Sequence, residues 1–268
     1  PNVYDGDTPS SRRGKIRDTS RIILSNPDML HMGILPQHPR WATFFATLRV
    51  VVVDEMHVYR GVFGSHVANV IRRLMRICEF YGSKPVIIMT SATIQNAAAH
   101  AEKLIDRPVI HISEDGAPKG ERNFLVFNPP VLLPELGVRE GLQSTTLKFL
   151  TQLYSSGVQT LVFCRTRRFV ELLLREARDI IRGSQESIRG YRSGYLKAER
   201  REIETGLRTG EIRCAIATNA LELGVDIGGV DAVLLPGYPG SIASMRQRAG
   251  RAGRSTHPSL ALFIASMT

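Results

Sequence analysis

The sequence predicts an α/β protein of two domains, each a mostly parallel sheet flanked by helices. Segments typical of strands alternate with segments of helical periodicity, which favours parallel sheets covered by helices. The alternation occurs on both sides of a polar stretch, Glu114–Glu121, that contains two glycines and a proline and is typical of a linker. The length of 268 residues suits two ordinary domains, which we place at residues 1–119 and 120–268.

The first domain is organised around the stretch Leu48–His57, LRVVVVDEMH. Its four consecutive valines are β-branched and apolar, so we expect a strand buried on both faces of a parallel sheet. Proline at position 27 ends an earlier strand, because it donates no hydrogen bond and restricts the residue before it. The basic stretch Ser10–Arg17 is predicted to be an exposed loop. Further strands are predicted at 21–25, 84–90 and 108–112, and helices at 28–34, 64–79 and 97–104.

The second domain repeats the alternation after an extended, irregular segment at 122–139. Apolar residues recur at helical spacing in some segments and form short continuous runs in others, which separates amphipathic helices from buried strands. Helices are predicted at 142–154, 168–181, 196–207 and 242–249, and strands at 159–164, 212–217, 231–235 and 260–265.

Composition indicates a soluble globular protein, with 43% hydrophobic and 22% charged residues. No apolar run approaches the roughly 18 residues needed to span a bilayer, so we expect no membrane partner. Cys78, Cys164 and Cys214 lie in apolar segments without pairing or metal-ligand spacing, and we expect buried thiols in a cytoplasmic protein. The net charge of +10 and the pI near 9.9 suggest a polyanionic partner, although an ordinary basic surface would give the same balance.

Two adjacent acids, Asp54 and Glu55, follow the valine strand directly. Ligands bind at the carboxyl edge of open α/β sheets, and an unpaired buried charge is too costly to serve packing. Nucleotide hydrolysis uses such a pair, with one carboxylate holding Mg²⁺ through its water shell and the next orienting the attacking water. A strand end that simply turns into solvent is the alternative.

Three other features each have a structural and a functional interpretation. The turn Ser25–Asp28 either joins a strand to a helix or presents backbone N–H groups to phosphate. Ser91-Ala92-Thr93 follows a predicted strand, where its small residues permit close approach of another element or begin a helix through a hydroxyl turn. Arg72, Arg73 and Arg76 lie between the apolar positions of a predicted helix, and a solvated face is favoured over a nucleic-acid contact.

Several short stretches resemble, in order, motifs II to VI of the superfamily 2 helicases. They are DEMH at 54–57, SAT at 91–93, LVFCRTR at 161–167, ATNALELGVDIGGVD at 217–231 and QRAGRAGR at 247–254. Four longer stretches resemble the YprA/MrfA-type DEAD/DEAH-box helicases: YDGDTP at 4–9, SNPDMLH at 25–31, DEMHVYRGVFGSHVANVIRRL at 54–74 and GYRSGYLKAERREIE at 190–204. The resemblance covers essentially the whole chain.

This resemblance implies two RecA-like domains with a nucleotide cleft between them. It also implies an ATP-driven 3′→5′ DNA translocase that is associated with DNA repair and uses ATP and Mg²⁺. Its partner is single-stranded or partly duplex DNA, with RNA also possible. The full-length relatives usually carry a cysteine-bearing C-terminal domain of unknown function.

The resemblance further assigns roles to matching residues of the first domain. Asp54 matches the acid that binds Mg²⁺, and Glu55 matches the acid that activates water. His57 matches a position that links the hydrolysis site to the second domain. Motif III, which couples nucleotide state to domain closure, is matched by Ser91, Ala92 and Thr93.

In the second domain, Gln247, Arg251 and Arg254 match motif VI. An arginine finger needs a planar, permanently charged group that reaches the γ-phosphate. The small residues between the arginines favour close approach to a ligand, whereas a basic helix start is the structural alternative. Gly224 and Asp226 match the motif V residues that face ribose and phosphate.

A last group of residues matches positions that grip the nucleic-acid backbone. They are Ser25, Asn26 and Pro27 in the first domain and Arg165, Thr166 and Thr218 in the second. Tyr191 and Arg192 are further candidates for contact with the strand, against the alternative of packing at a domain surface. Because a backbone grip does not read bases, little sequence specificity is expected.

The sequence departs from the helicase pattern at one point, because it contains no G-x-x-x-x-G-K-[ST]. The nearest candidate, Gly14-Lys15, is followed by Ile16 and lacks the preceding glycine. We therefore expect an internal piece of a longer helicase that hydrolyses ATP poorly without a phosphate-binding loop. Two alternatives remain: a non-catalytic nucleic-acid-binding module derived from a helicase, and an RNA helicase.

Overall fold

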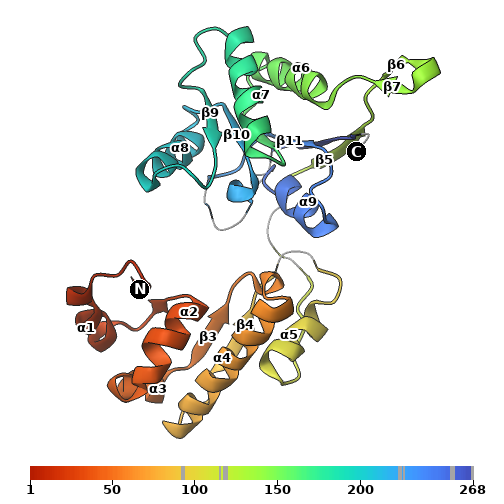
Figure 1. Ribbon diagram of the computed structural model, residues 1–268. Coiled ribbons are helices and arrows are strands. Elements are labelled where there is room, and N and C mark those ends of the chain that lie inside the picture. Colours follow the sequence, from red (N-terminus) through yellow and green to blue (C-terminus); the bar gives the residue numbers. More distant parts are fainter. Residues whose placement is uncertain are drawn as a thin grey trace. The chain divides into compact units, whose positions relative to one another are not determined.

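The computed structural model describes residues 1–91, 94–114, 116, 120–222, 225, 227–253 and 257–266. The chain divides into two compact units, Pro1–Glu114 and Asp115–Thr268, and each is described by itself (Figure 1). Both combine parallel strands with flanking helices, so the predicted α/β class is confirmed. In the described part of the chain, no helix has the length and apolar character needed to cross a bilayer.

In its described residues, the first unit contains two short parallel strand pairs. Strand β1 (Asn2–Val3) pairs with β2 (Ile23–Leu24), and β3 (Val50–Val53) pairs with β4 (Val86–Met89). The helices are α1 (Ser10–Thr19), α2 (Pro27–Met29), α3 (Ala42–Thr47), α4 (Gly61–Phe80) and α5 (Ala97–Ile105), with π-helical or 3₁₀ segments at Leu30–Ile34, Leu35–Trp41 and Met56–Val58.

The prediction that the valine strand is buried on both faces is wrong. Val50 and Val52 are 46% and 60% exposed, and the neighbouring Val86 and Ile88 are 64% and 48% exposed. The alternate residues of both strands pack against helices α4 and α5 or against the aromatic cluster around Trp41. Among the described residues this sheet has two strands and one covered face, so every second side chain faces outward.

Two other predictions for this unit are also wrong. The segment 108–112 forms no strand, and its Ile110 and Ile112 are 93% and 84% exposed. The segment 10–17 belongs to helix α1 rather than to a loop. Helix α1 has no buried residue, so the apolar periodicity that reveals a helix in a sequence is missing from it.

Helix α4 forms the central support of the first unit. Its Val67, Ile71 and Met75 pack on the β3–β4 side together with α5, as the apolar spacing in the sequence predicts. Gly64 lies in its first turn so close to the Tyr59 carbonyl that any side chain would clash with it. The helix therefore begins directly beneath the segment that follows Asp54 and Glu55.

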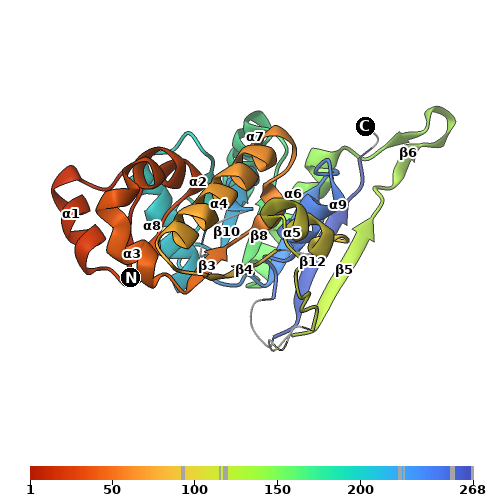
Figure 2. The ribbon, with the colours of Figure 1, turned by 90° about the horizontal axis from the view of Figure 1, so that it is seen from below.

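The described part of the second unit is built on a six-stranded parallel sheet in the order β5-β12-β11-β8-β10-β9. A small antiparallel hairpin stands apart from this sheet (Figure 2). The sheet strands are β5 (Arg122–Phe127), β8 (Thr160–Phe163), β9 (Ile188–Tyr191), β10 (Cys214–Ala217), β11 (Ala232–Pro236) and β12 (Ser259–Ile264), and the hairpin strands are β6 (Val131–Leu133) and β7 (Val138–Arg139). The helices are α6 (Leu142–Ser155), α7 (Arg167–Ile180), α8 (Lys197–Thr209) and α9 (Ile242–Ala249), with 3₁₀ turns at Pro134–Leu136 and Asn219–Leu221.

Helices cover both faces of this sheet. Leu161 and Phe163 of β8 point toward α8 and α9, whereas Val162 points toward α6 and α7. The central strands β8, β10 and β11 are buried along their whole length, as their continuous apolar runs predict. All three cysteines of the chain are buried free thiols, and burial raises the pKa of Cys214 to about 12.

Candidate nucleotide and nucleic-acid sites

The two acids lie where strands β3 and β4 end side by side. Val53 is in register with Met89, and the Thr90 N–H donates to the Val53 carbonyl at 3.0 Å. The Met56 N–H in turn donates to the Thr90 carbonyl at 2.9 Å. These bonds attach the Asp54–Glu55 turn to the end of β4, so the backbone that carries both acids is fixed from two sides.

Asp54 is oriented by two donors that converge on one of its oxygens. The Glu55 N–H donates to Oδ1 at 2.9 Å, and the Thr90 hydroxyl donates to the same atom. The Asp54 side chain is exposed, and its Oδ2 accepts no hydrogen bond from a described residue. Burial, followed by the charge of Asp54, raises the pKa of Tyr59 nearby. Thr90 was missed by the sequence analysis, because 36 residues separate it from its partner.

Glu55 has a backbone conformation that is unusual for its residue type. Its φ of 52° lies in the left-handed region, which costs a residue with a Cβ free energy and often marks a functional site. The side chain is 42% exposed, and its Oε2 lies 3.3 Å from Nδ1 of the buried His57. His57 therefore restrains the Glu55 carboxylate at Oε2, while the rest of this side chain is accessible to solvent.

The donor set around Asp54 fits Mg²⁺ held together with a nucleotide. The described residues contain no group of three or more His, Cys, Asp or Glu that could enclose a metal ion. Magnesium ions commonly bind one or two carboxylates and take their other ligands from water and phosphate oxygens. One exposed carboxylate with a free oxygen suits this mode, whereas an all-protein metal cage does not.

The predicted coupling motif is only partly described. Ser91 follows β4 and Thr90 directly and is half-buried. Ala92 and Thr93 lie outside the described residues. The assignment of this motif therefore stays a prediction.

The turn at Ser25, Asn26 and Pro27 is well defined and faces solvent. The Ser25 hydroxyl donates to the Tyr4 carbonyl at 2.7 Å, and Asn26 caps helix α2 by accepting from the Met29 N–H at 2.8 Å. Pro27 occupies the first helical position. The strand-to-helix interpretation thus describes the local structure, and the exposed surface of the turn also leaves room for a ligand.

In the second unit, four predicted residues follow three neighbouring strands at the carboxyl edge of the sheet. Arg165 is exposed just after β8, and Thr166 caps helix α7 by accepting from the Phe169 N–H at 3.2 Å. Thr218 follows β10 and is buried, and Arg192 follows β9. Because β8, β10 and β9 are adjacent and parallel, the structure brings these four residues to one edge.

Tyr191 packs in the core and cannot stack on a base. It is 1% exposed, and its hydroxyl donates to Glu204 at 2.7 Å. Burial, reinforced by Glu204, raises its pKa to about 12. Arg192 is partly exposed, pairs with Glu171 at 2.9 Å and lies over the Tyr195 ring at 4.9 Å. Tyr191 therefore packs, although in the core and not at the domain surface that the alternative named.

The described arginines of the QRAGRAGR stretch are buried rather than on a basic helix start. Arg251 donates to the Glu222 and Val225 carbonyls at 2.5 and 2.8 Å. Arg248 pairs with the Glu222 carboxylate at 2.9 Å and lies 5.4 Å from the centre of the Phe163 ring. The two arginines therefore contact Glu222 and Val225, which neighbour the predicted nucleotide contacts in the sequence. No local sequence pattern marks Glu222 or Arg248, because 26 residues separate these two partners.

Other predictions for this region are outside the description or need correction. Gly224, Asp226 and Arg254 lie outside the described residues, and Gln247 is half-buried on α9. The small residues were expected to permit approach of a ligand, but Ala249 and Ala252 pack in the core. Gly253, at φ 75°, lies against Ser259, so these small residues serve packing.

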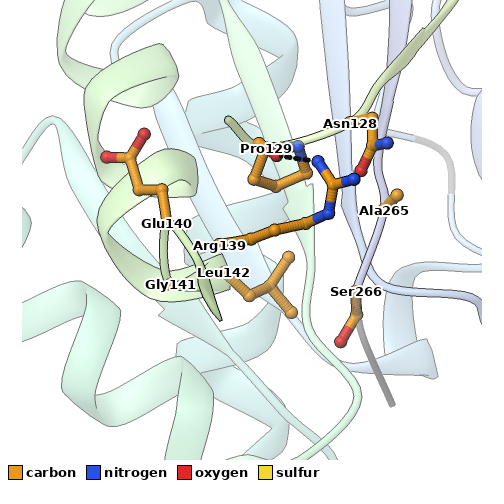
Figure 3. Close-up of a pocket in the computed structure, with 8 residues that line it drawn as sticks. All are labelled: Asn128, Pro129, Arg139, Glu140, Gly141, Leu142, Ala265 and Ser266. Atoms are coloured by element: carbon orange, nitrogen blue, oxygen red, sulfur yellow. Dashed lines mark hydrogen bonds between the residues drawn. The ribbon is translucent and has the colours of Figure 1, made fainter. Parts of the chain in front are cut away.

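A hollow of about 310 Å³ lies in the second unit, beyond the ends of β5 and β12 (Figure 3). Arg139 crosses it and donates to the Pro129 carbonyl at 2.7 Å. None of the predicted site residues lines it. The lining residues are Asn128, Pro129, Arg139, Glu140, Gly141, Leu142, Ala265 and Ser266. The acid pair of the first unit, and not this hollow, therefore defines the candidate catalytic site.

Comparison with known families gives two matches. Residues 1–101 match the DEAD/DEAH box helicase family, and residues 145–256 match the helicase conserved C-terminal domain. The chain is 49% identical to the uncharacterized ATP-dependent helicase YprA of Bacillus subtilis, over 99% of this chain and 36% of that protein. It is 44% identical to the ATP-dependent helicase HRQ1 of Saccharomyces cerevisiae, over 99% of this chain and 25% of that protein. The chain thus spans only about a third or less of these relatives.

Solved structures agree with these matches. The structure of the DUF1998 helicase MrfA bound to DNA and AMPPNP superposes with a TM-score of 0.95 at 48% identity and covers 100% of this chain and 37% of that one. The Mycobacterium smegmatis helicase Lhr bound to ssDNA and AMP-PNP gives a TM-score of 0.77 at 25% identity and covers 98% of this chain and 34% of that one. The predicted RecA-like helicase fold is confirmed.

Proposed function

Because this chain belongs to the DEAD/DEAH-box helicases, we propose that it is part of the motor of an ATP-dependent DNA helicase or translocase. The intact motor hydrolyses ATP, moves 3′→5′ along single-stranded DNA and serves DNA repair in the cytoplasm. The polarity and the repair role rest on the sequence motifs, and the cytoplasmic setting rests on the three free thiols.

The observation that carries this proposal is the geometry of Asp54, Glu55 and Thr90 at the end of β3. Two donors hydrogen-bond to one oxygen of Asp54, and the other oxygen of this exposed side chain is left open to solvent. The next residue holds a second carboxylate in a strained backbone conformation beside His57. Packing alone does not explain an exposed carboxylate, a left-handed glutamate and a buried histidine in four consecutive positions.

Each acid has a separate role in this proposal. Bound Mg²⁺–ATP supplies the phosphoanhydride bond and the charge neutralisation. Asp54 offers its free oxygen to the water shell of the metal ion. Glu55 accepts a hydrogen bond from the attacking water and orients it, as a general base positioned for the reaction. His57 restricts the rotation of the Glu55 carboxylate through their 3.3 Å contact.

Residues of the second unit contribute positive charge to the nucleotide site and contacts to the nucleic-acid backbone. Arg251 provides a permanent charge for a phosphate group, and Gln247 and Arg254 assist it. Gly224 and Asp226 face the ribose and phosphate of the nucleotide. Ser91, Ala92 and Thr93 couple the nucleotide state to domain closure. The backbone of the DNA strand is bound by a set of residues from both units: Ser25, Asn26, Pro27, Arg165, Thr166, Arg192 and Thr218.

DNA is the proposed partner for two reasons. The helicases MrfA and Lhr were solved with bound DNA, and this chain carries a net charge of +10. Arginine and hydroxyl contacts to phosphate do not read bases, so we propose weak sequence specificity. Competition between matched DNA and RNA single strands at a fixed salt concentration tests this choice, since equal affinity would support the RNA alternative.

The test of the proposed function is DNA-stimulated ATPase activity. We expect this chain to hydrolyse ATP weakly, because its sequence has no G-x-x-x-x-G-K-[ST]. A chain extended upstream through a phosphate-binding loop should show single-stranded-DNA-stimulated hydrolysis. In that chain Glu55→Gln should lower the rate by about 10²–10⁴ while binding of a fluorescent ATP analogue is retained. Absence of activity in both chains would favour a non-catalytic binding module.

A further inference from the structure

Helix α1 carries basic residues that the packing of the first unit does not explain. Four of its ten residues are basic and one is acidic, and none of the ten is buried. Ile16 is half-buried and packs against the cluster around Trp41, whereas Arg12 and Lys15 are exposed. These two basic residues must therefore be accounted for by something other than the packing of the fold.

The charges of α1 are also placed against the preferences of a helix. Its first turn contains no acid and includes Arg12 and Arg13, although the positive end of the helix dipole favours negative charge there. Pro9 precedes the helix without a capping side chain, and Gly14 lies in its interior. Such local disagreement with the fold is expected at functional positions.

A set of polar contacts holds α1 beside the turn that contains Ser25. Arg13 donates to the Thr8 and Asp5 carbonyls at 3.1 and 3.3 Å, and its guanidinium lies 5.7 Å from the centre of the Tyr4 ring. The Tyr4 backbone N–H donates to the Leu24 carbonyl at 2.8 Å, and the Tyr4 carbonyl accepts from the Ser25 hydroxyl at 2.7 Å. Because β1 and β2 are parallel, the turn that follows β1 and leads into α1 lies at the same edge of the strand pair as the Ser25 turn that follows β2.

Two basic side chains of α1 remain available to a ligand. Arg13 is engaged as described, and Arg17 pairs with Asp18 at 2.8 Å. Arg12 and Lys15 are exposed. Because they are three residues apart, they lie on the same side of the helix, about 4.5 Å apart along its axis. This distance is on the order of the spacing between successive charges in one strand of a DNA duplex.

We propose that Arg12 and Lys15 of α1 form a phosphate-binding face that extends the nucleic-acid contact of the Ser25–Pro27 turn. The ligand is the backbone of a DNA strand, because closely spaced phosphates offset the mutual repulsion of the basic residues and their unfavourable position in the helix. The inference rests on the proposed DNA-binding function and adds a site to it.

The test compares two double substitutions in the 268-residue chain. Arg12→Ala with Lys15→Ala removes the proposed face, whereas Arg73→Ala with Arg76→Ala removes the same charge from helix α4, also three residues apart. Binding of a labelled single-stranded oligonucleotide is measured by fluorescence anisotropy at several NaCl concentrations. Each phosphate contact to a single strand contributes about 0.7 to the slope of log K against log salt concentration. The α1 variant should therefore lose about 1.4 from this slope.

The expected result is a shallower slope for the α1 variant, with the α4 variant close to the parent chain. The thermal midpoint of the α1 variant should not fall, since Arg12 and Lys15 contribute no buried surface. A slope equal to that of the parent, or equal losses in both variants, would overturn the inference and leave DNA binding itself in place. A parent chain that binds no single-stranded DNA would overturn the proposed function together with the inference.

Discussion

At the scale of single residues, the candidate catalytic site depends on the orientation of the Asp54 carboxylate. Asp54 lies at the exposed end of a short strand, where a free aspartate would sample several rotamers. The Thr90 hydroxyl and the Glu55 N–H together select one of them. Hydrogen bonds to a charged group contribute about 1.5–3 kcal/mol each, so the loss of either donor should be measurable.

Replacing Thr90 therefore gives a specific prediction. Thr90→Val keeps the shape of the side chain but removes the donor to Asp54. In a chain that carries a phosphate-binding loop, we expect the Mg²⁺ concentration for half-maximal ATPase activity to rise about tenfold, which corresponds to about 1.4 kcal/mol. Thr90→Ser keeps the hydroxyl and serves as the control. If the valine and serine variants need the same Mg²⁺ concentration, the Thr90–Asp54 bond has no such role.

At the scale of elements, an ion pair between largely buried side chains connects the end of helix α9 to the segment that follows β10. Glu222 and Arg248 are 11% and 9% exposed, and the guanidinium also lies over the ring of Phe163. Removal of one partner of a buried pair leaves an uncompensated charge, which is strongly destabilising. The pair thus ties Glu222 to helix α9, next in the sequence to the predicted nucleotide contacts.

A double-mutant cycle tests the contribution of the Glu222–Arg248 ion pair to stability. Glu222→Gln and Arg248→Met should each lower the free energy of unfolding by about 3–5 kcal/mol, because each leaves its partner buried and unpaired. The combined variant should cost clearly less than the sum of the two, since no unpaired charge remains. Urea unfolding of the four chains measures these values. Additive losses would show that the two side chains act separately.

Sequence patterns predicted some elements well and missed others for definite reasons. Helix α9 was predicted at its observed bounds, since local signals such as the Ser241 cap define it. Strand β9 was missed because Arg189 and Gly190 interrupt its apolar pattern. The acid pair could be proposed as a site from the sequence because both residues are adjacent in the chain. Thr90 and Glu222 act on partners 36 and 26 residues away, a pairing that only the fold reveals.

At the scale of the whole molecule, the two units differ in how completely their sheets are covered. As far as the structure describes it, the sheet of the second unit has six strands with helices on both faces. The β3–β4 sheet of the first unit has two strands in the described part of the chain, and Val52 and Val86 are at least 60% exposed. Local stability follows buried apolar contacts, so the units should differ in how readily their strands open.

Hydrogen exchange measured by mass spectrometry should show this difference. Amides of β8 and β10 are expected to exchange slowest, because both strands are central and fully buried, whereas those of β3 and β4 should exchange at least tenfold faster for about 1.4 kcal/mol less local stability. Strand β9 provides an internal control, since it is a sheet edge with buried side chains. Intermediate protection of β9 would show that covering the faces matters beyond the number of neighbouring strands. Equal protection of β3 and β8 would contradict this account, because the exposed valine face would then carry no cost in local stability.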